Sequence, residues 1–216
     1  MSDDRLDGVL FEAFGRDDDE SVLAALDRLH GATSHVFLRE TEDEETGPVL
    51  MRKGADAAQD DSRYQVLGEI ARGGIGVVYK GRDKDLGRDV ALKVLRPEHA
   101  GREDVIQRFV EEAQVGGQLQ HPGIVPVYGM GLQEDGRPCF AMKLIKGRTL
   151  AEILDAPGEH VDRLAVFEQV AQTMAYAHSR GVIHRDLKPA NVMLGAFGEV
   201  QVVDWGFAKV LGQEEP

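Results

Sequence analysis

The spacing of apolar residues along this chain changes from a helical period to a strand-like one and back again. Apolar and polar residues alternate over residues 64–70, a period typical of a half-buried strand. Residues 90–95 form an apolar run with one lysine in the middle, which predicts a second strand. Two further pairs of short apolar runs predict hairpins, residues 124–128 with 139–142 and 192–194 with 200–203.

Helical spacing predicts helices over residues 103–119, 149–154 and 161–179. The apolar face of the last one would be buried in a helical lobe and consists of Leu164, Phe167, Val170, Ala171, Met174 and Ala177.

The helix predicted over residues 103–119 contains an unusual pair of glycines. Phe109, Ala113 and Leu119 indicate its buried stripe, but Gly116 and Gly117 interrupt it. Each glycine in a helix interior costs about 1 kcal/mol relative to alanine. We therefore expect this helix to be mobile.

The first 63 residues differ from the rest of the chain in charge. They carry 17 acidic and 7 basic side chains, whereas residues 64–216 carry 21 and 18. This acidity argues against binding of nucleic acid or an anionic membrane. Helical spacing occurs at residues 6–14 and 22–29, and the polar residues that follow are typical of a linker. Two interpretations stay open: an acidic leader, partly helical or disordered, that docks weakly or not at all, or a partner-docking or regulatory segment.

Composition limits the class of protein. The chain is 42% hydrophobic and 29% charged, values typical of a globular protein. It has no run of 18 apolar residues and no apolar signal core at its N-terminus, so we expect neither a membrane span nor a secretory signal. The single Cys139 cannot form an internal disulfide, which favours a cytoplasmic location.

The most informative chemistry lies in residues 184–191, His-Arg-Asp-Leu-Lys-Pro-Ala-Asn. Asp186, Lys188 and Asn191 place a carboxylate, an ammonium and an amide in one proline-containing loop. Asp204 follows the next apolar run. This set suits phosphoryl transfer, which needs a carboxylate to take a hydroxyl proton, a cation for the transferred group and oxygen ligands for a metal ion.

The loop resembles the catalytic loop of the protein kinases, HRDLKPxN in the serine/threonine branch. A glycine-rich stretch, a strand lysine, a helix glutamate and Asp204-Trp205-Gly206 stand around it in the family order. The chain is thus identified as a member of this family, of the bacterial serine/threonine type. The resemblance implies an α+β, two-lobed fold. Residues 64–145 would be a complete N-lobe, an antiparallel sheet plus one helix and the hinge, and residues 146–216 a partial helical C-lobe.

The resemblance also implies roles for single residues. Asp186 would orient the substrate hydroxyl and accept its proton, and Lys188 would stabilise the transferred phosphoryl group. Asn191 and Asp204 would hold Mg²⁺. Lys93 would position the phosphates of ATP while paired with Glu112, which leaves the neighbouring Glu111 facing solvent.

Further residues would bind ATP, and several depart from the family pattern. The implied nucleotide-binding residues are Ile70, Ala71, Gly73, Gly76, Val78, Ala91, Lys93, Met142, Lys143, Ile145 and Met193. Ala71 replaces the first loop glycine, Trp205 replaces the usual phenylalanine, and Gly116 stands where the family places a bulky apolar residue. Trp205 adds an indole N–H that needs a partner.

The chain stops ten residues after Gly206, before the family's activation segment and later helices. We therefore expect residues 1–216 alone to be a weak kinase at best, with apolar surface exposed on the helix at 161–179. Expected partners are ATP and proteins bearing serine or threonine. One alternative is a nucleotide-binding pseudokinase without turnover. Another is a truncated scaffold, against which the retention of all the charged catalytic groups argues.

Overall fold

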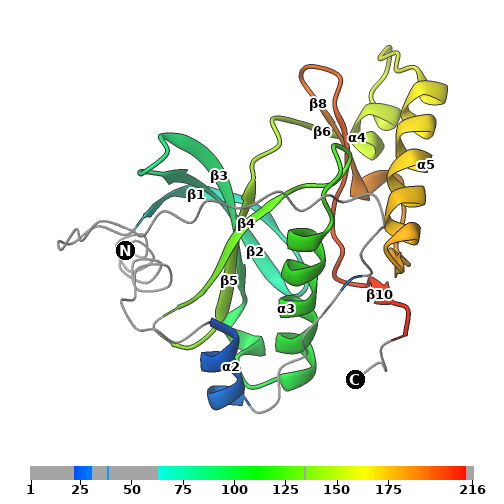
Figure 1. The fold of residues 1–216 in the computed structure, drawn as a ribbon. Helices are drawn as coiled ribbons and strands as arrows, with labels where there is room; N and C mark the ends of the chain where they lie inside the picture. The colour runs from blue at the N-terminus through cyan, green and yellow to red at the C-terminus, as the bar shows by residue number, and fades with distance from the viewer. Residues whose placement is uncertain (1–21, 31–37, 39–62, 134, 213–216) are drawn as a thin grey trace.

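The computed structural model describes residues 22–30, 38, 63–133 and 135–212. These residues form a sheet-rich lobe and a helical lobe, so the α+β class and the two-lobed fold are confirmed (Figure 1). The helix expected at residues 6–14 lies outside the described part. The one expected at 22–29 is present as α2 (Val22–His30). No helix within the described ranges is long and apolar enough to cross a membrane.

The N-lobe contains a five-stranded antiparallel sheet in the order β1-β2-β3-β5-β4. Its strands are β1 (Tyr64–Arg72), β2 (Gly76–Asp83), β3 (Arg88–Leu95), β4 (Val127–Leu132) and β5 (Pro138–Lys143). The central strand β3 is apolar from Val90 to Leu95 apart from Lys93, because both of its faces are covered there. One face carries the cluster around Val90 and Leu92, and the other packs with Leu95 against helix α3 (Glu103–Gln118).

Strand β4 begins later than the apolar pattern predicts. We expected a strand from residue 124, but the ladder starts at Val127. Pro126 has no backbone N–H to donate, and Ile124 forms an isolated parallel bridge with Val202 of the other lobe. The apolar run is therefore divided between the two lobes.

The glycine pair in α3 has a packing explanation for one of its members. Gly116 is buried, and a Cβ atom placed on it would lie 2.9 Å from Cγ2 of Val127. The helix thus approaches β4 more closely than any larger residue would allow. Gly117 is exposed, and a Cβ there would meet no atom within 4 Å.

This difference gives a matched pair of substitutions. We expect Gly117→Ala to raise the free energy of unfolding by about 0.5–1 kcal/mol, because alanine is the better helix former and fits without contact. Gly116→Ala should lower it by about 1 kcal/mol, because crowding of a stiff valine outweighs the gain in helix propensity. Urea unfolding of both variants measures the difference. Equal stabilisation by the two alanines would show that the α3–β4 contact is looser than described.

The C-lobe is built on helices α4 (Leu150–Asp155) and α5 (Arg163–Ser179). Thr149 and Glu152 form a capping box at the start of α4, and the side chain of Asp162 caps α5. Two small sheets and a short helical turn complete the lobe: β6 (Gly147–Thr149) with β8 (Val192–Gly195) and β9 (Val200–Val202), β7 (Val182–Ile183) with β10 (Lys209–Val210), and η2 (Pro189–Asn191) before β8. Another short turn, η1 (Pro97–His99), precedes α3 in the N-lobe.

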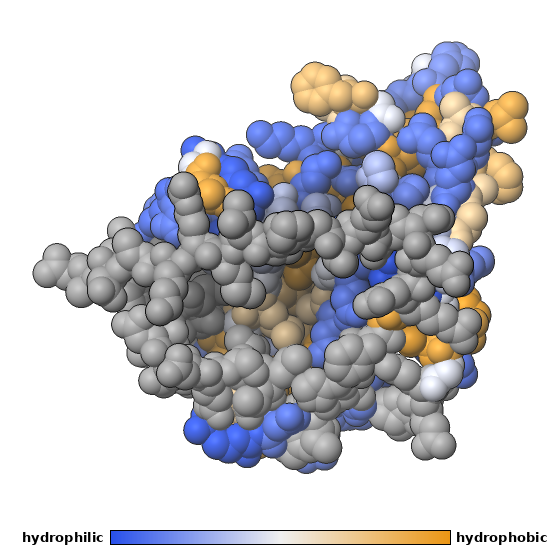
Figure 2. Space-filling model, viewed as in Figure 1, coloured by the Kyte–Doolittle hydropathy of each residue, from blue (hydrophilic) through white to orange (hydrophobic). Residues whose placement is uncertain are grey.

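The predicted apolar face of α5 is only partly buried. Met174 and Ala177, toward its C-terminal end, are buried in the cluster that contains Val182 of β7 and Val202 of β9. Leu164 and Phe167 are instead 77% and 69% exposed. Apolar side chains accordingly gather on the surface over α5 (Figure 2), as expected for this helix. Ala171 is also exposed. The prediction that all six positions are buried is therefore wrong for these three, whereas the expectation of exposed apolar surface on this helix is confirmed.

The loop between α3 and β4 ties the two lobes together. Val202 donates its backbone N–H to the carbonyl of Gly123 at 2.7 Å, and Gln120 donates its own to the hydroxyl of Tyr176 at 2.9 Å. A Cβ atom on Gly123 would lie 1.9 Å from Oγ1 of Thr173, so only glycine fits there. The C-terminal end of α3 is therefore attached to α5. The predicted domain boundaries after residues 63 and 145 stay predictions.

Candidate active site

The structure brings Lys93 of β3 and Glu112 of α3 together between the lobes. Lys93 Nζ lies 2.5 Å and 2.7 Å from the two carboxylate oxygens of Glu112, and their side chains are 14% and 12% exposed. Burial raises the pKa of the Glu112 carboxyl above its usual 4.5, and the ammonium of Lys93 opposes this effect. Glu111 is half-buried and takes no part in the pair.

The segment that begins at Asp204 lies against this ion pair. Asp204 Oδ1 is 4.0 Å from Lys93 Nζ, and a Cβ atom on Gly206 would lie 3.1 Å from Oε2 of Glu112. Asp204 adopts a φ of +64°, a conformation that is uncommon for residues other than glycine. Such backbone conformations often mark functional sites, and here it belongs to a carboxylate that is 45% exposed.

Trp205 fills the apolar space behind that carboxylate. Its side chain is 5% exposed and packs in the cluster that contains Val115, Leu119 and Ile124. The indole Nε1–H donates to the carbonyl oxygen of Val202 at 3.4 Å, so the N–H has the partner that its burial requires.

The loop of residues 184–191 gathers three of the predicted groups around one carboxylate. Oδ2 of Asp186 accepts from Lys188 Nζ at 2.7 Å and from Asn191 Nδ2 at 3.1 Å. Asn191 Nδ2 also donates to the backbone carbonyl of Asp186 at 2.9 Å. The hydrogen bond from Lys188 holds the pKa of Asp186 below its usual value, so the carboxylate is ionised at neutral pH.

His184 supports this loop, although the sequence reasoning assigned it no role. Its ring is 2% exposed, its Nδ1 accepts from the N–H of Asp186 at 3.3 Å, and its Nε2 therefore donates to the carbonyl of Val203 at 3.1 Å. Burial lowers the pKa of His184, in agreement with a neutral ring. The ring also contacts Trp205 at a centroid distance of 4.7 Å. His184 thus connects the two acidic segments of the site.

The glycine-rich turn is held by two side chains that the sequence reasoning missed. Arg96 donates to the carbonyl of Gly73 at 3.1 Å, and Nε2 of His99 lies 2.8 Å from the carbonyl of Gly74. Gly73 N–H donates to the carbonyl of Gly76 at 2.9 Å and closes the turn. No local pattern indicates these contacts, because both side chains come from the segment after β3.

The other predicted nucleotide residues lie in register on neighbouring strands. Ala71 of β1 pairs with Val78 of β2, and Val78 pairs with Lys93. In β3 and β5, Ala91 pairs with Met142. The remaining ones are distributed over β1, the β5–β6 hinge and β8, namely Ile70, Lys143, Ile145 and Met193. The predicted set thus comes from β1, β2, β3 and β5 of the N-lobe sheet, from the hinge, and from β8, the middle strand of the C-lobe sheet.

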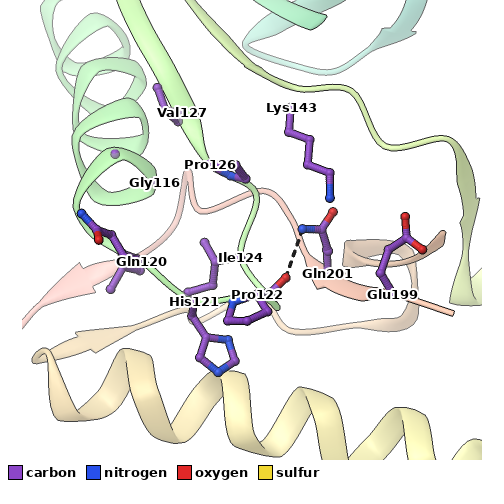
Figure 3. Close-up of a pocket in the computed structure, with 12 residues that line it drawn as sticks. Gly116, Gln120, His121, Pro122, Ile124, Pro126, Val127, Lys143, Glu199 and Gln201 are labelled. Carbon is purple, nitrogen blue, oxygen red and sulfur yellow. Dashed lines mark hydrogen bonds between the residues drawn. The ribbon is translucent and has the colours of Figure 1, made fainter. Parts of the chain in front are cut away.

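A groove of about 640 Å³ lies elsewhere, behind the hinge (Figure 3). Its walls come from the end of α3, the α3–β4 loop and β9, and Lys143 is the one predicted nucleotide residue that lines it. Gln201 lines it too and donates to the carbonyl of Pro122 at 3.1 Å. The groove contains neither Lys93 nor Asp186, so it is separate from the candidate active site.

The donors around Asp204 fit a magnesium ion that is shared with phosphate groups. Mg²⁺ prefers hard oxygen ligands and is usually held by one or two carboxylates together with substrate phosphates. Asp204 offers an exposed carboxylate. The amide nitrogen of Asn191 donates to Asp186, so the amide oxygen of Asn191 could coordinate a metal ion. Among the described residues no cluster of three His, Cys, Asp or Glu side chains could hold a metal alone.

Comparison with known proteins agrees with this geometry. The protein kinase domain family matches residues 64–216. Serine/threonine-protein kinase PknD of Protochlamydia amoebophila is 37% identical over 164 residues, and PknD of Chlamydia muridarum is 41% identical over 172 residues. PrkC of Bacillus subtilis, also a serine/threonine-protein kinase, is 38% identical over 151 residues. The similar region covers 69%, 71% and 69% of this chain but only 17%, 18% and 23% of these relatives. The chain belongs to the protein kinase domain family, and its relatives are bacterial serine/threonine-protein kinases.

Proposed function

We propose that this chain transfers the γ-phosphoryl group of ATP to serine or threonine hydroxyls of proteins, with Mg²⁺. The observation that carries this proposal is the convergence of Lys93, Glu112 and Asp204 from three separate elements, with Lys93 Nζ 2.5 Å from one carboxylate and 4.0 Å from the other. A half-buried ammonium between two carboxylates is an arrangement suited to a bound polyphosphate and its metal ion.

Lys93 and the turn at residues 73–76 would bind the phosphates. Glu112 neutralises and orients the ammonium in the absence of ligand, so the cation is already in place when ATP arrives. Arg96 and His99 occupy the carbonyls of the turn, which fixes its backbone over the phosphate position. Phosphate binding by backbone amides needs such a fixed turn.

Asp186 and Lys188 would act on the transferred group. The ionised Asp186 can orient a substrate hydroxyl and accept its proton. Lys188 is 51% exposed and pairs with Asp186. Its ammonium could therefore turn toward the negatively charged phosphoryl group while that group passes from ADP to the acceptor oxygen. Asp204 and Asn191 would hold Mg²⁺, which would neutralise negative charge on the phosphates of ATP.

The choice of serine and threonine rests on Lys188 and on the relatives, which are named serine/threonine-protein kinases. A pseudokinase function is less well supported, because each charged group that turnover needs is present and paired.

Cys139 is buried, and burial raises the pKa of its thiol to about 12. The cytoplasmic location and the weak activity of residues 1–216 alone stay predictions.

Titration of the chain with a non-hydrolysable ATP analogue tests the first step. We expect a micromolar dissociation constant with Mg²⁺, about −8 kcal/mol, and at least about tenfold weaker binding after chelation of the metal. Transfer of labelled phosphate to peptides that differ only in Ser, Thr or Tyr then separates a kinase from a pseudokinase. Absence of binding by a chain that circular dichroism shows to be folded would refute the proposal.

A further inference from the structure

The acidic N-terminal region contributes two leucines to the core of the kinase domain. Leu26 of α2 is fully buried, and Leu38 is 8% exposed. Helix α2 lies beside the lower end of α3, outside the range 64–216 that matches the family (Figure 1). Both leucines therefore add apolar contacts to a helix that carries Glu112.

Leu26 lies in the apolar cluster that joins α2 to the N-terminal half of α3 and to strands β4 and β5. Its cluster includes Ile106, Phe109 and Ala113 of that helix together with Phe140 of β5. The ring of Phe109 lies on Phe140 at a centroid distance of 5.1 Å, and its centroid is 6.0 Å from Nζ of Lys93. Leu26 thus belongs to the same cluster as Phe109 and Phe140, the two aromatic side chains nearest to the ammonium of Lys93.

Leu38 packs on the C-terminal half of the same helix. Its backbone N–H donates to Oε1 of Gln118 at 3.1 Å, and its side chain belongs to the cluster of Val115, Leu119 and Trp205. Gln118 also donates to the carbonyl of Gln114 at 3.2 Å, inside the turn that contains the glycine pair. Leu38 therefore covers the turn of α3 in which the two glycines lower helix stability most.

These contacts lie on both sides of Glu112 along α3. We propose that α2 and Leu38 form an intramolecular clamp that positions α3 so that Glu112 pairs with Lys93. Leu26 and Leu38 are then positioning residues for nucleotide binding, since neither touches the site itself. The inference rests on the proposed function in one respect, the use of Lys93 to bind ATP. It otherwise concerns the order of α3 without ligand.

Substitution of Leu26 separates the clamp from a general effect on folding. We expect Leu26→Ala to weaken binding of the Mg²⁺-bound ATP analogue about tenfold, because α3 and Glu112 lose their support. Leu29 lies on the same helix, is 53% exposed and serves as the matched control. Leu29→Ala should change the affinity less than twofold.

A double-mutant cycle tests whether the effect passes through Glu112. In a Glu112→Gln background, Leu26→Ala should have no further effect on affinity, because the pair that the clamp supports is already broken. An undiminished tenfold effect in that background would show that Leu26 supports the lobe in general, and it would overturn the proposal. So would a folded Leu26→Ala variant that binds as the wild type does.

Hydrogen exchange without nucleotide tests the clamp independently of ATP. Leu38→Ala should speed the exchange of the amides in the last two turns of α3 about tenfold or more and leave those of β3 unchanged. This measurement also serves if Leu26→Ala fails to fold. If the wild type does not bind ATP, the proposed function fails, whereas unchanged exchange in Leu38→Ala overturns the clamp.

Discussion

Asp186→Asn is expected to slow phosphoryl transfer about 10²–10⁴-fold, the range that a positioned general base contributes. The amide keeps the shape of the carboxylate but cannot accept the hydroxyl proton. Affinity for the Mg²⁺-bound ATP analogue should stay within about twofold, because the predicted nucleotide contacts come from other residues. Single-turnover transfer to a serine peptide and calorimetric titration measure the two effects.

The control for this substitution lies on the C-lobe surface. Asp155 ends α4 and is exposed, so Asp155→Asn removes the same charge away from the site. We expect it to change neither rate nor affinity. Equal rates for Asp186→Asn and the wild type would mean that another group takes the proton, and a parallel loss of affinity would mean that Asp186 organises the whole loop.

Lys93→Met is expected to have the largest effect on stability. Removal of one partner of a buried ion pair costs about 3–5 kcal/mol, because the other charge is left in a poorly solvated place. We expect a loss of about 3 kcal/mol in the free energy of unfolding near neutral pH, measured by urea titration. Binding of the ATP analogue should weaken at least about tenfold.

This loss should depend on pH in a defined direction. Burial already raises the pKa of Glu112 above 4.5, and removal of the ammonium raises it further. Above pH 4.5 the folded variant then keeps a proton that the unfolded chain releases, so its stability falls as pH rises toward the raised pKa. The deficit relative to the wild type should therefore be smaller at pH 5 than at pH 7.5.

Two controls accompany Lys93→Met. Lys80 on the neighbouring strand β2 is 43% exposed and pairs with Asp89 at 3.4 Å. An exposed pair contributes about 0–1 kcal/mol, so Lys80→Met should change stability little and without this pH dependence. Glu111→Ala should leave ATP affinity unchanged, whereas Glu112→Ala lowers it. Equal effects of the two alanines would mean that our assignment of the helix face is wrong.

Much of the fold and of the candidate site was predictable from local pattern. The apolar run around Lys93 predicts a strand, and the structure shows that this strand is the central one of the N-lobe sheet, with both faces covered. The spacing of residues 184–191 and 204 placed Asp186, Lys188 and Asp204 in segments that the structure brings to the same part of the molecule. The choice of Glu112 over Glu111 came from the family spacing, and the structure pairs Glu112 with Lys93.

Other features depended on contacts between distant parts of the chain. Ile124 has strand character, yet it pairs with Val202 because the lobes meet there. Gly116 is unfavourable within its helix and is explained only by the approach of Val127. Two hydrogen bonds set the tautomer of His184, and nothing in the sequence around it predicts them. Leu26 and Leu38 are buried, although they belong to an acidic region whose sequence left open whether it docks at all.

The sequence by itself thus determined the family, the main strands and helices, and the charged groups of the site. Periodicity and motif spacing are read from residues close together in the sequence, and each additional matching position strengthens the prediction. The tertiary structure decided which apolar side chains are covered, why α3 tolerates Gly116, and how closely Glu112 lies to Lys93. Those outcomes depend on packing between residues far apart in the chain, which local periodicity does not encode.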